Sequence, residues 1–162
     1  MITFRPMFGG EFTRYLEYFV PDYAAEISTN YGVSASDALV MAQREIARDL
    51  PLGPETPGQL LFCIIKDNSP GTVIGYVWYC PDEERRSVFI CDFCILPEQR
   101  GNGQGRRALV ALEAMLHTHG YSEIKLRVAA DNSRAQHVYK AGGFRVTGFN
   151  MVKQIGQSGE QE

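Results

Sequence analysis

A glycine-rich stretch in the second half of the chain has the residue types and spacing of an anion site. It reads Ile95-Leu96-Pro97-Glu98-Gln99-Arg100-Gly101-Asn102-Gly103-Gln104-Gly105-Arg106-Arg107, between an apolar run and a long helical pattern. Glycines at alternate positions leave backbone N–H groups uncovered, and a helix that starts there directs its free N–H groups and positive dipole end at the turn. The stretch therefore predicts a phosphate or pyrophosphate site, although the glycines alone are equally typical of an empty surface turn.

Two nucleotide-binding motifs also contain closely spaced glycines. A P-loop needs Lys-Ser or Lys-Thr after its glycines, and none follows here. The residues from Gly103 to Ala108 do match the dinucleotide pattern G-x-G-x-x-G/A. That pattern belongs after the first strand of a parallel unit with much chain still to come. Here an antiparallel meander is predicted before the turn and little chain remains after it, so neither motif is favoured.

The spacing of Cys91 and Cys94 is that of a metal or redox pair. The run from Val88 to Leu96 has the pattern of a strand, however, and positions i and i+3 of a strand point to opposite faces. No second pair completes a metal site. The four cysteines of the chain are therefore predicted to be small buried hydrophobic residues, which fits a cytoplasmic protein.

The first half of the chain is predicted to hold one strand and two helices. The strand spans 2–5, and a helical pattern runs from about residue 11 to residue 30, where Pro21 either kinks the helix or starts a new one. Ser34 begins a second helix over about 35–50. The apolar stripe expected on this second helix is Ala35, Leu39, Ala42, Ile46 and Leu50.

The second half is predicted to hold most of the sheet. Strands over 59–66, 72–79 and 87–96 with short turns indicate an antiparallel meander. We then expect the following elements: a helix over 103–119, a strand over 123–128, a helix over 133–141 and a last strand or hairpin over 144–153. No repeat or linker divides the chain, so residues 1–153 are predicted to form one domain and 154–162 a polar tail.

Composition excludes several classes of protein. The 162 residues suit one domain with its own core. The net charge of −3 argues against a broad nucleic-acid surface, which needs an excess of Lys and Arg. No apolar run is long enough for a membrane span, and the first residues lack the layout of a signal peptide. We therefore expect a cytoplasmic protein with no nucleic-acid or membrane partner.

Two motifs together resemble the GNAT superfamily of acyl-CoA-dependent N-acetyltransferases. Arg100 to Gly105 have the form R-x-x-G-x-G after a strand that ends near Pro97, and Asn132 to Phe144 have the form N-x-x-A-x-x-x-Y-x-x-x-G-F. The order of predicted elements is also similar over nearly the whole chain. The resemblance implies an α/β (α+β) fold with a mixed, mostly antiparallel sheet, flanked by about four helices in the order β-α-α-β-β-β-α-β-α-β.

The resemblance also implies how acetyl-CoA would be held, with no metal. The backbone of Ile95 meets the pantetheine and the acetyl group, beside a bulge that splays the fourth and fifth strands, and Cys94 adjoins this point. Asn132 lies beside the pantetheine arm, and Tyr139 reaches toward the thioester sulfur. The residues that would wrap or flank the pyrophosphate are Arg100, Gly101, Asn102, Gly103, Gln104, Gly105 and Arg106.

Acetyl transfer to an amine needs a neutral amine and a stabilised thiolate leaving group. A phenol has a pKa of about 10 and a thiol about 8.5, so full proton transfer from Tyr139 is uphill and hydrogen bonding is its expected role. The alternative is that Tyr139 only packs under its helix. Asp92, a lone acid in an apolar strand, is the candidate base. The alternative is that Asp92 is a structural residue whose carboxylate is paired with a neighbouring Arg, Tyr or backbone group.

We therefore expect an N-acetyltransferase that moves an acetyl group from acetyl-CoA to a primary amine by direct attack in a ternary complex. A non-catalytic acyl-CoA-binding sensor or interaction module on the same fold is the alternative. The acceptor, a small amine or a peptide amine, is not named by any motif, although Tyr18, Asp22 and Glu26 are spaced to share a face on its side. A homodimer is compatible with the resemblance.

Overall fold

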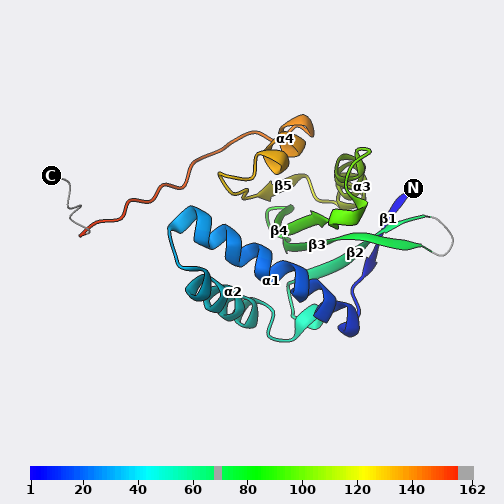
Figure 1. Ribbon diagram of the computed structural model, residues 1–162. Coiled ribbons are helices and arrows are strands. Elements are labelled where there is room, and N and C mark those ends of the chain that lie inside the picture. Colours follow the sequence, from blue (N-terminus) through cyan, green and yellow to red (C-terminus); the bar gives the residue numbers. More distant parts are fainter. Residues whose placement is uncertain (68–70, 157–162) are drawn as a thin grey trace.

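The computed structural model describes residues 1–67 and 71–156 (Figure 1). Within these ranges the order of elements follows the sequence-based expectation as far as the fourth long helix. The elements are β1 (Ile2–Pro6), α1 (Gly9–Tyr31), α2 (Ala35–Asp49), β2 (Leu60–Lys66), β3 (Thr72–Asp82), β4 (Ser87–Ile95), α3 (Gln104–Thr118), β5 (Glu123–Leu126) and α4 (Ser133–Ala141), with short 3-10 turns at Gly53–Glu55 and Pro97–Gln99. The predicted turn at 67–71 falls partly outside the described residues.

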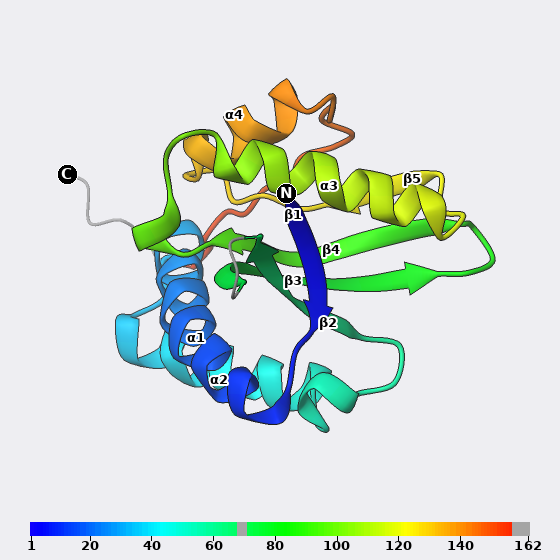
Figure 2. The same ribbon diagram turned by 90° about the vertical axis from the view of Figure 1, so that its right-hand side faces the viewer.

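The five strands form one sheet in the order β1-β2-β3-β4-β5. The pairs from β1 to β4 are antiparallel, and β4 pairs with β5 in parallel from Ser87 opposite Glu123 to Ile90 opposite Leu126. Helices α1 and α2 lie on one face and α3 on the other, as Figure 2 shows. The mixed, mostly antiparallel sheet predicted from the sequence is confirmed.

Alternation along β3 divides the core between the two faces of the sheet. Tyr76 and Trp78 pack against Tyr15 and Phe19 of α1. Val77, from the same strand, belongs to the cluster that α3 covers. The amphipathic faces of α1 and α3 are therefore what hold the sheet between them.

Helix α1 continues through Pro21 as one helix of 23 residues. Helix α2 begins where Ser34 was expected to cap it, and the Ser34 hydroxyl accepts a hydrogen bond from the Asp37 N–H at 3.2 Å. The buried stripe of α2 differs from the expected one, because Ala38 is fully buried and Leu39 is 40% exposed. Small residues of α1 and α2 pack together at Ala24, Ala38 and Ala42, and this close approach turns Leu39 outward.

A bulge interrupts the pairing of β3 with β4. Trp78 lies opposite Asp92 and Tyr79 lies opposite Ile90, so Cys91 has no partner on β3. The parallel pairing of β4 with β5 also ends at Ile90. From Cys91 onward, the edge of β4 that would face β5 therefore has no neighbouring strand. The strands β4 and β5 diverge here, as the resemblance implied.

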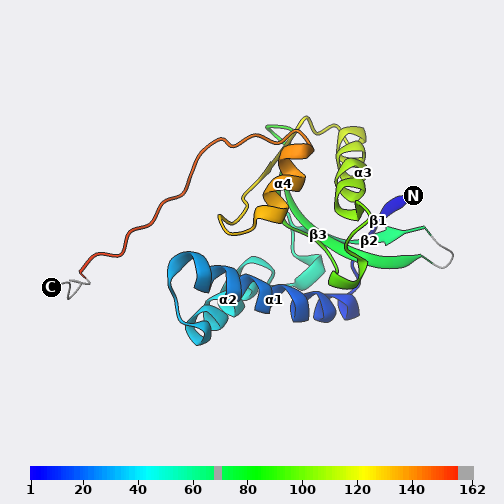
Figure 3. The same ribbon diagram turned by 45° about the horizontal axis from the view of Figure 1, so that its top comes forward.

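The last strand expected over 144–153 is not formed. Beyond α4 no strand is assigned as far as Gly156, the last described residue. We call Arg145–Ile155 the C-terminal arm. It leaves the body of the molecule as an extended segment (Figures 1 and 3). The residue pattern favours a strand, but a strand also needs a neighbour to pair with, and a sequence pattern does not supply one.

Candidate active site

The glycine turn before α3 has the backbone conformation of an anion cradle. Gly101, Asn102 and Gly103 have φ values of 94°, 54° and 72°, so three successive residues are left-handed. Such turns direct neighbouring N–H groups into one concavity. Within the described part of the chain, five N–H groups here donate to no protein acceptor: those of Gly101, Asn102, Gly103, Gly105 and Arg106.

The arginines of this turn have different positions. The Nε of Arg100 donates to the carbonyl of Ile95 at 2.9 Å, which ties the turn back to the end of β4. The Nη2 of Arg107 donates to Gln104 at 3.2 Å. Arg106 is exposed. Arg100 therefore shapes the cradle through its contact with Ile95.

The end of β4 is held close to β3 by a glycine. A Cβ on Gly75 would lie 2.1 Å from the carbonyl oxygen of Cys94, so no other residue fits without movement of the backbone. Cys94 belongs to the cluster on the α1 side of the sheet and Ile95 to the cluster on the α3 side. The two neighbours thus point to opposite faces, as the strand pattern predicted.

A cavity of about 380 Å³ occupies the region where β4 and β5 diverge. It brings together Asp92, Asn132 and Tyr139, which were predicted to act in catalysis or cosubstrate binding, and Glu26, which was predicted to lie on the acceptor side. Cys94, Ile95 and the cradle residues do not line it. These residues come after Asp92 in the chain, at the end of β4 and in the turn before α3. The predicted site therefore consists of a cavity and an adjoining cradle.

Asp92 is held in this cavity by a tyrosine from α1. The hydroxyl of Tyr15 donates to the Oδ2 of Asp92 at 2.8 Å, and Tyr15 is fully buried. Burial raises the pKa of Asp92 to about 7, and the hydrogen bond from Tyr15 acts in the opposite direction. The carboxylate is therefore satisfied by a neighbouring Tyr and still lines the cavity, so the two sequence-based alternatives for Asp92 do not exclude each other.

Tyr139 lies on α4 and also lines the cavity. Its ring packs edge-on against Phe144, with 5.5 Å between the ring centroids. Burial, followed by the negative charge of Asp92 and by Cys94, raises the pKa of the Tyr139 phenol above its usual value. Tyr139 is therefore protonated at neutral pH and able to donate a hydrogen bond.

Asn132 caps α4 at the mouth of the cavity. Its Oδ1 accepts a hydrogen bond from the N–H of Ala135 at 3.1 Å. Gln136 donates to the carbonyls of Ala129 and Ala130, each at 3.1 Å, and this holds the loop from β5 to α4. Asn132 thus has a structural role in this structure in addition to its place in the cavity.

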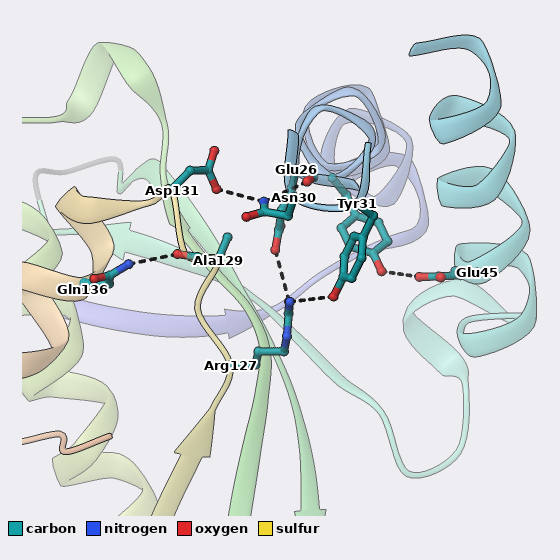
Figure 4. A network of polar contacts seen from close by, with 9 residues as sticks. Glu26, Asn30, Tyr31, Glu45, Arg127, Ala129, Asp131 and Gln136 are labelled. Carbon is teal, nitrogen blue, oxygen red and sulfur yellow. Dashed lines mark hydrogen bonds and ion pairs between the residues drawn. The ribbon is translucent and has the colours of Figure 1, made fainter. Parts of the chain in front are cut away.

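A polar network that sequence reasoning missed joins α1 to this loop (Figure 4). Arg127 contacts Glu26 at 3.4 Å and donates to the hydroxyl of Tyr31 at 2.8 Å. Asn30 donates to Asp131 at 2.9 Å. Glu26 and Arg127 line the cavity, so the network forms part of its rim. Each of these contacts joins residues about a hundred positions apart, and Tyr15 and Asp92 are 77 positions apart. A local sequence pattern therefore does not predict these contacts.

No group of three or more residues that could hold a metal ion is found among the residues that the structure describes. In the described ranges, no helix is long and apolar enough to cross a membrane. All four cysteines are free. The prediction that they are buried is wrong for Cys91, which is exposed, and for Cys80, which is half-buried, whereas Cys63 and Cys94 are buried.

Comparison with known proteins identifies the family of this chain. The model of the Acetyltransferase (GNAT) family matches residues 21–144. The uncharacterized N-acetyltransferase YycN of Bacillus subtilis is 30% identical over 156 residues, which cover 95% of this chain and 99% of that protein. Its crystal structure has a TM-score of 0.88, with 96% of this chain and 99% of that chain covered.

Two solved structures with lower identity share the fold. The PaiA N-acetyltransferase of Thermoplasma acidophilum in complex with coenzyme A has a TM-score of 0.67 at 17% identity, with 93% of each chain covered. The spermidine N-acetyltransferase of Vibrio cholerae in complex with CoA and spermine has a TM-score of 0.62 at 21% identity, with 91% of this chain and 82% of that chain covered. With the family model spanning most of the chain, and with relatives that align over almost its full length, this protein belongs to the GNAT family of acetyltransferases.

Proposed function

We propose that this protein transfers an acetyl group from acetyl-CoA to a primary amine by direct attack in a ternary complex. The observation that carries this function is the cavity between β4 and β5. It joins a carboxylate whose pKa is near neutrality, Asp92, to a protonated phenol, Tyr139. One group suits removal of a proton from the amine, and the other suits stabilisation of a leaving thiolate.

The chain has the features needed to hold acetyl-CoA. The cradle offers backbone N–H groups without protein acceptors, which suits a pyrophosphate. The stretch of β4 beyond Ile90 has free backbone groups for the amide groups of a pantetheine arm. The residues that would hold the cosubstrate are Cys94 and Ile95 by their backbone, Arg100, Gly101, Asn102, Gly103, Gln104, Gly105 and Arg106 at the cradle, and Asn132 beside the arm. When bound, acetyl-CoA supplies the thioester that is cleaved.

Asp92 is the proposed base. An alkylamine has a pKa of about 10.4, whereas an ordinary carboxylate has one of about 3.9. At about 7, the pKa of Asp92 lies much closer to that of the amine, so removal of the ammonium proton is less costly. The hydrogen bond from Tyr15 holds the carboxylate in place while leaving its other oxygen for the substrate.

Tyr139 is the proposed partner of the leaving group. Because its pKa is raised above 10, transfer of its proton to a thiolate with a pKa of about 8.5 is more unfavourable than for a free phenol. Its role is therefore a hydrogen bond to the sulfur as the C–S bond breaks and the C–N bond forms. The amine loses two protons in the reaction: one goes to Asp92, and the second ends on the sulfur as the free thiol.

Direct attack is favoured over an acyl-cysteine intermediate. The thiolate is the nucleophilic form of cysteine. Cys94 is the cysteine beside the proposed acetyl position. Burial, and then the negative charge of Asp92, raise its pKa above the usual value. Cys94 is therefore a thiol at neutral pH, which disfavours a covalent step through its sulfur.

The test is release of free thiol from acetyl-CoA across a panel of primary amines. We expect turnover with at least one amine, a loss of kcat on the order of 10²-fold in Tyr139→Phe and Asp92→Asn, and little change in acetyl-CoA binding. Tyr121→Phe is the matched control, because its hydroxyl donates to exposed Glu83 and Tyr121 does not line the cavity. Tight acetyl-CoA binding without turnover on any amine would instead indicate the binding module.

A further inference from the structure

We propose that the acceptor carries a second positive charge, and that Glu45 of α2 binds this second cation while the amine to be acetylated lies at Asp92. The chemical class is an aliphatic amine with a second ammonium group, such as an α,ω-diamine. This assignment rests on the proposed function, because it names the acceptor of the same cavity. It also gives Glu45, which no sequence motif indicated, a role in specificity.

The lining of the cavity between β4 and β5 is strongly acidic. Four acidic residues line it: Glu26, Glu45, Asp49 and Asp92. Among the described lining residues, Arg127 is the one cation. A second cavity of about 250 Å³ shares Glu26 with the first and adds Asp22 and Asp131. The whole chain has a net charge of only −3, so negative charge is concentrated at the two cavities, and a cleft of one sign attracts the opposite charge.

Two of these acidic residues already have a cation in the protein. Glu26 contacts Arg127 at 3.4 Å. Asp49 contacts Arg48 at 2.9 Å, and the side chain of Arg48 is exposed. A third acidic residue is the proposed base. The carboxylate of the first cavity that remains for a second cation is therefore Glu45.

Glu45 is fixed in position by a neutral donor. The hydroxyl of Tyr23 in α1 donates to its Oε2, which Figure 4 shows as the dashed line at Glu45. Burial, and then this hydrogen bond, raise the pKa of Tyr23 above its usual value, so the phenol stays protonated. Among the ion pairs of the described residues, none involves Glu45. A neutral donor holds the carboxylate without balancing its charge, and Oε1 is left to bind a cation.

A series of aromatic contacts connects the proposed base with Glu45. Trp78 lies opposite Asp92 in the pairing of β3 with β4. The ring of Phe19 packs edge-on against Trp78, with 5.9 Å between the centroids, and stacks on Tyr23 at 5.5 Å. All three rings line the cavity, and Tyr23 is the residue that donates to Glu45. An apolar wall between two carboxylates suits the methylene chain of a diamine, and ring faces attract ammonium groups.

An acceptor with a carboxylate next to its amine fits this lining poorly. The guanidinium of Arg127 already contacts Glu26 and donates to the hydroxyl of Tyr31 at 2.8 Å. The other charged residues that line the cavity are acidic, so a negative group on the acceptor would be repelled. We therefore expect amino acids to be poor acceptors.

Binding measured without turnover tests the second cation directly. With CoA in place of acetyl-CoA no acetyl group can be transferred, so calorimetry reports binding alone. The probes are α,ω-diamines from ethylenediamine to octamethylenediamine, each compared with the monoamine of the same length. We expect the best diamine to bind at least about tenfold more tightly than its monoamine, and this advantage to shrink as the salt concentration rises. Equal binding throughout the series would overturn the proposal.

Glu45→Gln tests the assignment to a single residue. Glutamine keeps an oxygen that accepts from Tyr23 and removes the charge, so the advantage of the diamine should be lost while monoamine binding is retained. Glu17→Gln is the matched control, because Glu17 is exposed on α1 and lines neither cavity. The control should keep the full advantage. A Glu45→Gln protein that still prefers the diamine would overturn the role of Glu45, and the comparison in the wild-type protein remains decisive if this variant fails to fold.

Turnover with acetyl-CoA separates this proposal from the proposed function. We expect kcat/KM for the best diamine to exceed that of its monoamine by about tenfold or more. Monoamines that are acetylated as fast as diamines would support acetyl transfer and overturn the second cation. Preferential binding of diamines without turnover of any amine would support the cation site at Glu45 and count against acetyl transfer.

Discussion

At the scale of single residues, the most informative contact is the one between Tyr15 and Asp92. A carboxylate placed among aromatic side chains loses hydration, and this raises its pKa to about 7. The hydroxyl of Tyr15, at 2.8 Å, favours the charged form and keeps the pKa from rising further. Tyr15 therefore acts through Asp92 as a positioning residue that sets where the base titrates.

The pH dependence of the reaction should report this contact. Because the base must be deprotonated, kcat/KM of the wild-type protein should fall as the pH drops through about 7. In Tyr15→Phe the charged form loses its donor, so the acid limb should move to higher pH, by about one pH unit or more. Rates measured from pH 5 to pH 9 check this.

Tyr76→Phe is the control for that shift. Tyr76 is also buried and packs against Tyr15, with 5.2 Å between the ring centroids. The hydroxyl of Tyr76 makes no hydrogen bond to Asp92 among the contacts of the described residues. The acid limb of this variant should stay in place. Equal shifts in both variants would mean that packing, and not the Tyr15 hydroxyl, controls Asp92.

At the scale of elements, the site depends on two irregularities next to regular structure. The bulge at Cys91 lies where the pairing of β4 with β5 ends, next to the cavity. The left-handed turn from Gly101 to Gly103 starts α3 without a side-chain cap and leaves N–H groups free. An uncapped helix start costs stability, and a bound anion would replace the missing cap.

Gly105→Ala separates an anion cradle from an empty turn. Gly105 does not have a positive φ, and a Cβ there would lie 3.8 Å from Ile95, an ordinary contact. Alanine also favours a helix over glycine by about 0.5–1 kcal/mol, so the melting temperature should hold or rise. The added methyl would lie beside the free N–H groups of Gly105 and Arg106, so the KM for acetyl-CoA should rise by about tenfold.

Gly10→Ala in α1 is the matched change. A Cβ on Gly10 would meet no atom within 4 Å, and Gly10 lies far along the chain from the cradle. We expect the same direction of change in stability and an unchanged KM for acetyl-CoA. If Gly105→Ala also binds acetyl-CoA normally, the turn is not the pyrophosphate site.

At the scale of the whole molecule, the site lowers the stability of the fold that carries it. The pKa of Asp92 is higher in the folded protein than the ordinary value of 3.8. Between about pH 4 and pH 7, the folded state therefore binds more protons than the unfolded state. Stability falls across this window as the pH rises, and the loss is complete above pH 7.

The variant Asp92→Asn should remove this pH-dependent loss of folding stability. The amide oxygen still accepts from Tyr15, and the penalty for a buried charge disappears. Thermal unfolding should show the variant more stable than the wild-type protein at pH 8 and similar to it at pH 4, although its kcat should be lower by on the order of 10²-fold. Asp67→Asn, at an exposed position and not among the charges that act on Asp92, makes the same change of charge and should leave the difference near zero. A destabilised Asp92→Asn at pH 8 would contradict the raised pKa.

The sequence by itself determined the features that depend on local patterns. Strand alternation and helical periodicity predicted the meander and α1 to α4, because side-chain periods of 2 and 3.6 follow from backbone geometry. The spacing from Arg100 to Gly105 predicted a glycine turn at the start of α3, because left-handed conformations select glycine. The face taken by Leu39 was wrongly predicted, because packing between α1 and α2 decides it.

Only the tertiary structure decided which distant residues meet. The contact of Tyr15 with Asp92 and the network of Arg127 with Glu26 and Tyr31 each join segments that no local period relates. The same limit applies to the C-terminal arm. Its pattern is that of a strand, but a strand forms only where another edge supplies hydrogen-bond partners, and that edge is a property of the folded molecule.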